Sequence, residues 1–140
     1  MRKVFEDEFM ELQSGLISLC MEVVDGKVDK IFAYGSKEKK TIMFNAFFEV
    51  GGEIKTLNQL GVSRELAFEF LGLGIEDLEK MGEIGAKYNR PVPTELKLYY
   101  DVRTGQFRSE YKYHEVCSAD TGISSEEVFN EWLAEMRGQQ

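Results

Sequence analysis

The residues best suited to acid–base chemistry lie near His114, the single histidine of the sequence. Glu110 and Glu115 could orient or protonate it, and Cys117 follows closely enough to suggest a Cys/His dyad, so a small hydrolase using His114 is one hypothesis. On a strand, however, His114 and Glu115 point to opposite faces, and His114 shares its face with Lys112. We therefore expect an exposed histidine, assign no catalytic residue, and expect that the protein is not an enzyme.

Metal and phosphate chemistry have equally weak support. Two distant cysteines and one histidine do not provide the ligands of a closed zinc site. Four carboxylates follow a helical period and lack the loop spacing of a calcium site: Glu76, Asp77, Glu79 and Glu83. The nearby glycines match neither a phosphate-binding loop nor a dinucleotide-binding motif. We expect no metal and no cofactor, and we interpret the four carboxylates as a solvated helix face.

Composition limits the class of protein more firmly than these motifs do. The 140 residues are enough for one domain, residues 1–140, and 43% apolar residues are enough to fill one core. The formal net charge of -8 disfavours binding to a nucleic-acid backbone, which requires a basic surface. Acidic residues from Glu6 to Glu11 stand where the apolar part of a signal peptide would be, and no apolar run is long enough to cross a membrane. We expect a cytoplasmic protein with no nucleic-acid or membrane partner.

The first half of the chain should form a helix followed by a hairpin. Apolar residues recur at spacings of three and four from Val4 to Val24, which predicts an amphipathic helix. Val28–Ser36 and Thr41–Val50 are rich in residues that favour strands and predict a hairpin with a charged tip, and Glu53–Leu60 is a candidate third strand. In the second run Phe44 and its alternating neighbours share one face, and the other face, which carries Phe47, is not fully polar.

A second helical segment follows the candidate third strand. Ser63 is a fair N-cap, and apolar residues fall at helical spacing from Ala67 to Tyr88. Glycines at 72, 74, 82 and 85 each cost about 1 kcal/mol against alanine in a helix. They indicate close packing against the sheet, with a possible kink or break near Gly72–Gly74 as the open alternative.

The segment from Thr94 to Val116 predicts a second hairpin whose register can be tested by charge. If Asp101 pairs with Gln106, then Tyr99 lies opposite Arg108, and opposite charges meet further along: Lys97 with Glu110 and Glu95 with Lys112. A shift by one residue would lose both the ion pairs and the apolar face. Gly105 can close the turn in a left-handed conformation.

The last segment predicts a helix capped by Ser124, with Phe129 and Trp132 on its apolar face. The resulting order, α-β-β-(β)-α-β-β-α, lacks the regular alternation of strand and helix that parallel sheets require. We therefore predict an α+β fold, with an antiparallel sheet of four to five strands and helices packed on it.

Several stretches carry a resemblance to a known family. Pro93-Thr94 precedes a strand, the hairpin reads LKLYYDVRTGQFRSEYKY, and TGISSEEVFNEWL leads into the last helix. In the first half, KIFAYG and MFNAFFEVGGE fit more loosely. In this order the motifs resemble the YezG-like immunity proteins, which neutralise secreted toxins of bacterial polymorphic toxin systems.

The resemblance implies an antitoxin that binds a cognate toxin domain and occludes its active site. An acidic inhibitor suits a cationic toxin such as a nuclease. The candidate partner-binding residues are Glu76, Asp77, Glu79 and Glu83 on the middle helix, with Tyr99 and Asp101 on the second hairpin. Three alternatives remain: a small-molecule-binding regulatory module, the hydrolase using His114, and a purely structural oligomer.

Overall fold

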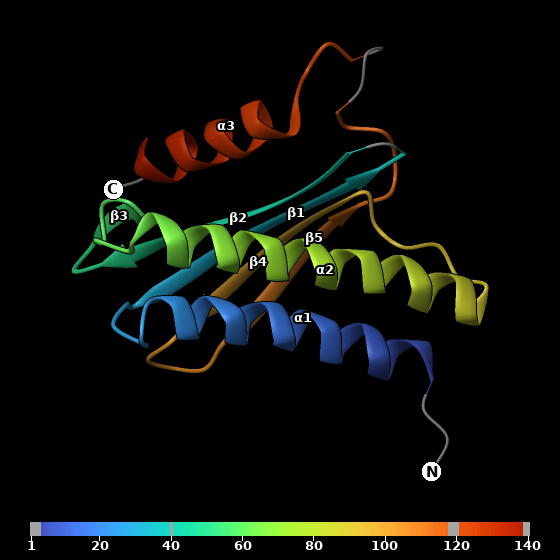
Figure 1. Ribbon diagram of the computed structural model, residues 1–140, viewed down its shortest axis with the longest axis horizontal. Helices are drawn as coiled ribbons and strands as arrows, with labels where there is room; N and C mark the ends of the chain where they lie inside the picture. The colour runs from blue at the N-terminus through green and yellow to red at the C-terminus, as the bar shows by residue number, and fades with distance from the viewer. Residues whose placement is uncertain (1–3, 40, 118–120, 139–140) are drawn as a thin grey trace.

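The structure is a computed structural model that describes residues 4–39, 41–117 and 121–138. Within these ranges it has three helices and five strands, which form the three layers seen in Figure 1. Helices α1 and α2 cover one face of the sheet, and α3 lies across the other face. The elements are α1 (Phe5–Val23), β1 (Lys30–Glu38), β2 (Thr41–Val50), β3 (Glu53–Thr56), α2 (Arg64–Tyr88), β4 (Glu95–Asp101), β5 (Phe107–Lys112) and α3 (Ser125–Gly138).

The sheet is antiparallel throughout, with the strand order β3-β2-β1-β4-β5. The predicted α+β class and the order of elements are therefore confirmed. The candidate third strand is shorter than Glu53–Leu60, because it ends at Thr56. There the chain turns back, with the amide of Leu60 donating to the carbonyl of Thr56 at 3.1 Å and the amide of Thr56 donating to the side chain of Gln59.

Helix α2 is unbroken from Arg64 to Tyr88, so the alternative of a break near Gly72–Gly74 is wrong. The Ser63 hydroxyl accepts a hydrogen bond from the amide of Leu66 at 3.1 Å, which confirms the predicted N-cap. Gly74 is buried against Phe44, where a Cβ atom would come within 2.0 Å of the ring. Close packing therefore accounts for Gly74, whereas a Cβ at Gly72 would meet nothing within 4 Å.

The second hairpin has the predicted register. Tyr99 lies opposite Arg108, Lys97 opposite Glu110 and Glu95 opposite Lys112. Gly105 has a φ of 78°, the left-handed conformation that its turn requires.

The second arm of that hairpin ends at Lys112 rather than at Val116. Beyond it the hydroxyl of Thr94 donates to the carbonyl of His114, and the chain then turns toward Glu38. The Glu38 carboxylate accepts hydrogen bonds from the amides of Val116 and Cys117 at 3.2 and 2.7 Å. These side-chain partners take the place of strand pairing, so the premise that His114 and Glu115 lie on a strand was wrong.

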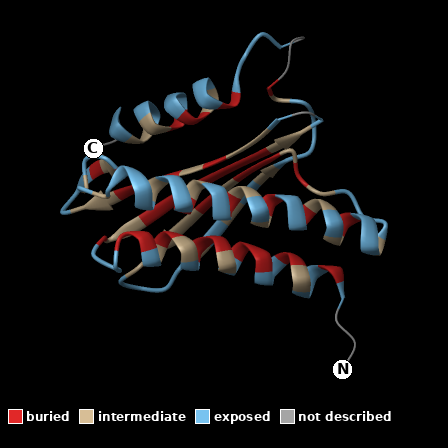
Figure 2. Ribbon diagram, viewed as in Figure 1, coloured by how far each residue is buried: buried red, intermediate tan, exposed pale blue. Residues whose placement is uncertain are grey.

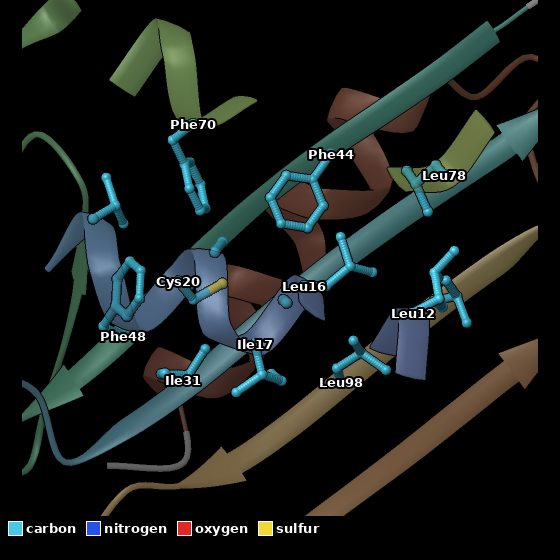
Figure 3. Close-up of a cluster of buried hydrophobic side chains, with 14 of the residues drawn as sticks. Leu12, Leu16, Ile17, Cys20, Ile31, Phe44, Phe48, Phe70, Leu78 and Leu98 are labelled. Atoms are coloured by element: carbon cyan, nitrogen blue, oxygen red, sulfur yellow. The ribbon is translucent and has the colours of Figure 1, made fainter. Parts of the chain in front are cut away.

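Two apolar clusters hold the three layers together. Figure 2 shows buried positions concentrated along the strands and on the inner sides of the helices. The larger cluster joins α1 and α2 to the sheet, and Figure 3 shows Leu16, Cys20, Phe44 and Leu78 within it. The smaller cluster, on the α3 face, consists of Phe32, Tyr34, Phe47, Ile54, Phe129 and Trp132. Because α3 covers this face, Phe47 is buried, which explains why the second face of β2 is not polar.

Candidate protein-binding surfaces

The six predicted partner-binding residues fall on two different faces of the molecule. The four carboxylates lie on α2, which covers one face of the sheet. Tyr99 packs with Trp132 of α3 on the opposite face, at a ring distance of 5.5 Å. Asp101 shares the side of Tyr99, because alternate residues of a strand face the same way. The structure therefore does not bring the six residues together in one surface.

On α2, three of the four carboxylates face solvent and one does not. Glu76, Glu79 and Glu83 are exposed, whereas Asp77 is half-buried at the side of the helix that faces α1. Burial raises the pKa of Asp77, and the ammonium of Lys80, 3.7 Å from its carboxylate, opposes that shift. We therefore place Asp77 in the helix packing and keep the other three as surface groups.

Phe68, on α2, is an exposed residue that the helical spacing of apolar residues did not single out as a candidate for binding. It is 78% exposed, the highest value among the exposed large apolar residues of the described chain. At a rotation of about 100° per residue it lies roughly 80° away from Leu78, at the margin of the apolar stripe. The sequence did contain one indication of its exposure, because an aromatic residue lies at the margin of the stripe that the helix buries.

Phe68 lies in line with bare and acidic positions. Gly72 follows it by four residues, Glu76 by eight, and this spacing places them on one side of the helix. Because Gly72 has no side chain and a Cβ there would meet nothing within 4 Å, the helix surface is bare one turn after Phe68. Glu65 and Glu69 are exposed beside it. We call Glu65, Phe68, Glu69, Gly72, Glu76, Glu79 and Glu83 the α2 outer face.

The second candidate surface is a groove that residues of all five strands and of α3 line. Its volume is about 750 Å³, and its lining includes Tyr99, Asp101, Arg108 and Met136. The guanidinium of Arg108 stacks on the Tyr99 ring at 3.8 Å, and the Tyr99 hydroxyl donates to Glu110 at 2.6 Å. Burial, followed by the hydrogen bond to Glu110, raises the pKa of Tyr99 to about 12.

The side chain of Asp101 forms hydrogen bonds within the turn that follows it. Its Oδ1 atom accepts hydrogen bonds from the amides of Arg103 and Thr104 at 2.9 and 3.2 Å. This is the geometry in which an aspartate stabilises a tight turn. Substituting Asp101 would therefore disturb the hairpin itself.

The groups proposed for catalysis are poorly placed for it. His114 is exposed in the bend after β5. Cys117 is buried beside Glu38, and burial followed by the charge of Glu38 raises the pKa of its thiol, which disfavours the nucleophilic thiolate. Burial also raises the pKa of Cys20. Among the described residues no cluster of three or more metal-ligating side chains is found.

No protein-family model matches the chain, and no curated protein matches its sequence. The resemblance to YezG-like immunity proteins therefore stays a prediction. In the part of the chain that the structure describes, the helices are all too short or too polar to traverse a lipid bilayer.

Proposed function

We propose that the protein is an immunity protein that binds a cognate secreted toxin through the α2 outer face. The observation that carries the proposal is Phe68, an aromatic side chain 78% exposed and flanked by carboxylates. Large aromatic side chains at the centre of an interface contribute much of the binding free energy, and a charged rim excludes water around them.

The electrostatics of this face favour a cationic partner. Five glutamates lie on the α2 outer face, and the whole chain carries a formal net charge of -8. Complementary charge accelerates encounter and orients the partners, so the toxin should present a basic surface around an apolar recess for the Phe68 ring. A nuclease meets this description, because its phosphate-binding surface is basic and would be blocked by the carboxylates.

Inhibition of this kind is stoichiometric. The resemblance to YezG-like proteins supports an antitoxin that occludes the active site of its partner without turnover. Gly72 fits this role, because its missing side chain allows another chain to approach the helix backbone beside Phe68. A glycine at an exposed helix position otherwise lowers stability by about 1 kcal/mol relative to alanine.

The first test is the substitution Phe68→Ala in a complex with the candidate toxin. We expect the dissociation constant to rise by about 30-fold or more, since truncation of an interfacial aromatic anchor costs about 2 kcal/mol or more. Protection of a toxin-expressing bacterium should be lost in parallel. Tyr113→Ala is the matched control, because Tyr113 is 54% exposed and lies off α2. Equal affinity of the Phe68→Ala variant and the parent protein would remove the α2 outer face from the mechanism.

Charge reversal tests the electrostatic part of the proposal separately. Glu79→Lys with Glu83→Lys should slow association and weaken its dependence on salt, because rim charges act mainly on the association rate. The matched control is reversal of two exposed glutamates on α3, Glu131 and Glu135. An association rate that both pairs lower equally would mean that only net charge matters, with no specific role for α2.

A small-molecule-binding function is the second candidate, and the groove beside α3 favours it. A volume of about 750 Å³ is within the range of ligand pockets, and Arg108 and Lys30 at its lining could hold an anionic group. A thermal-shift screen with and without Arg108→Gln would separate the two functions. This candidate would be favoured by a ligand that raises the melting temperature of the parent protein but not of Arg108→Gln, together with no protection in the toxin assay.

A further inference from the structure

Strand β5 forms one edge of the sheet, and half of its backbone faces outward. In an antiparallel pair, residues alternate between those that bond to the neighbouring strand and those that do not. The amide of Asp101 donates to the carbonyl of Gln106 at 2.9 Å, which sets this alternation. Arg108 and Glu110 therefore bond to β4. Phe107, Ser109 and Tyr111 direct their amides and carbonyls away from the sheet.

The bonding of β4 to its other neighbour agrees with this assignment. The amide of Val102 donates to the carbonyl of Asp29, and the carbonyl of Thr94 accepts from the amide of Lys37. These two even-numbered residues flank β4, and both bonds run toward β1; the amide of Thr94, at the end of the hairpin, donates to the carbonyl of Lys112. The odd-numbered residues of β4 then bond toward β5. The outward groups of β5 form a pairing edge of the kind that adds a strand from another chain.

We propose that this edge pairs with β5 of a second copy of the chain, antiparallel, about a two-fold axis at Ser109. In that register Phe107 lies opposite Tyr111 of the second copy, and both are outward-bonding residues, as a hydrogen-bonded pair requires. Arg108 lies opposite Glu110 of the second copy, and two-fold symmetry repeats the pair. Opposite charges on facing positions stabilise strand pairing.

Charge selects this register over its neighbours. An axis at Arg108 would set two arginines opposite each other, and an axis at Glu110 would set two glutamates opposite each other. Like charges on facing positions are unfavourable. The alternation of arginine, serine and glutamate along β5 is therefore self-complementary about Ser109. An axis at Tyr111 would set Glu110 opposite Lys112, but it would pair only residues 110–112 of β5, whereas the axis at Ser109 pairs residues 107–111.

The surroundings of β5 leave space for the second copy. Arg108 and Glu110 form an ion pair at 3.3 Å within one copy, and their side chains are still 63% and 50% exposed, so each can also meet its opposite charge in a second copy. Helix α3 packs against β2 and β3, and α1 packs mainly against β1 and β4, reaching β5 through Gln13 and Phe9. The opposite sheet edge, β3, has only four residues and offers a much shorter pairing segment.

This contact is separate from the α2 outer face, because α2 packs on β1 and β2 with that face turned to solvent, whereas β5 lies at the sheet edge beyond β4. A strand pairing of five residues, 107–111, is small for a protein–protein interface, so association should depend on concentration. The product is one continuous sheet made of two copies. Each copy keeps its α2 outer face free for a toxin.

Molecular mass in solution and charge exchange test the proposal. Sedimentation over a range of concentrations should show a mass rising from 16.1 kDa toward twice that value. Arg108→Glu or Glu110→Arg alone should weaken association by about tenfold or more, because both symmetry-related pairs become repulsive. The double exchange restores both pairs and should recover most of the affinity. Arg103→Glu, in the exposed turn, is the matched control for charge.

Cysteine substitutions test which residues of the two β5 strands lie opposite each other, and they do so even if a charge variant folds poorly. Facing residues of a hydrogen-bonded pair have Cα atoms about 5.5 Å apart, which a disulfide can span. Ser109→Cys should therefore give a covalent dimer on mild oxidation. Arg108→Cys and Glu110→Cys should not, since their symmetry mates would be roughly 8 Å apart at a strand spacing of about 4.8 Å. The natural cysteines are buried.

Three results would overturn the proposal. The first is a mass of 16.1 kDa at every concentration, which would leave the edge open to a strand of the toxin or of another partner. The second is association that the single charge variants do not weaken. The third is cross-linking at position 108 or 110 in preference to 109. Because Phe68→Ala should leave self-association unchanged, failure of this proposal and failure of the toxin proposal can be distinguished.

Discussion

Replacing Gly74 with alanine should destabilise the protein although alanine is the better helix former. The added Cβ would lie 2.0 Å from Cδ2 and 2.4 Å from Cγ of Phe44, in the body of the ring rather than at a mobile tip. Phe44 is buried and packs on Phe70 at a ring distance of 5.2 Å, so the ring cannot withdraw freely. Overpacking of this severity costs about 3 kcal/mol. Helix propensity returns about 1 kcal/mol, and the free energy of unfolding should fall by about 2 kcal/mol.

The matched control is Gly72→Ala in the same helix. A Cβ at this position meets nothing within 4 Å, so helix propensity acts alone and should raise the free energy of unfolding by about 1 kcal/mol. Urea denaturation followed by circular dichroism measures both variants under identical conditions. If Gly74→Ala matched or exceeded the stability of the parent protein, the close packing of α2 on β2 would be refuted.

Two further perturbations test the α3 side of the sheet. Trp132→Ala should lower the free energy of unfolding by about 3 to 5 kcal/mol, because Trp132 is 2% exposed and packs on Phe47 at 4.9 Å; a loss below 1 kcal/mol in a urea titration would argue against the α3 contact. The raised pKa of Tyr99, about 12, means that below pH 10 the phenol is neutral in folded and unfolded chains alike. Stability should then fall as the pH rises from 10 to 12, where the unfolded chain ionises first. The difference between the denaturation midpoints of the parent protein and of Tyr99→Phe should be constant below pH 10, where it reflects loss of the hydrogen bond to Glu110, and should change only above pH 10.

The second hairpin could be predicted down to its register because two independent constraints agree in it. Pairing Lys97 with Glu110 and Glu95 with Lys112 satisfies charge, and the same alignment keeps the apolar residues on one face. The far end of that hairpin could not be predicted. Strand pairing stops at Lys112 because Glu38, which is distant in sequence, accepts hydrogen bonds from the amides of Val116 and Cys117.

The face of the sheet that each helix covers could not be predicted from the periodicity of apolar residues. An amphipathic stripe tells which side of a helix is buried, but it does not tell which face of a sheet the helix covers. Phe47, on the second face of β2, was the one indication that both faces needed a cover. Once α3 occupies that face, Tyr99 and Asp101 are separated from the α2 carboxylates. The predicted binding residues therefore divide between two surfaces.

The position of α3 in the chain has a consequence for synthesis of the protein. Every strand precedes α3 in sequence, so the sheet and its α1–α2 cover can assemble before α3 is available. During that interval Phe32, Tyr34 and Phe47 would face water, as an aromatic patch exposed to chaperones, to proteases and to other nascent chains. Arrival of Phe129 and Trp132 closes the patch. Chains that stop before α3 should therefore be recognised as incomplete and removed, even when the rest of the fold has formed.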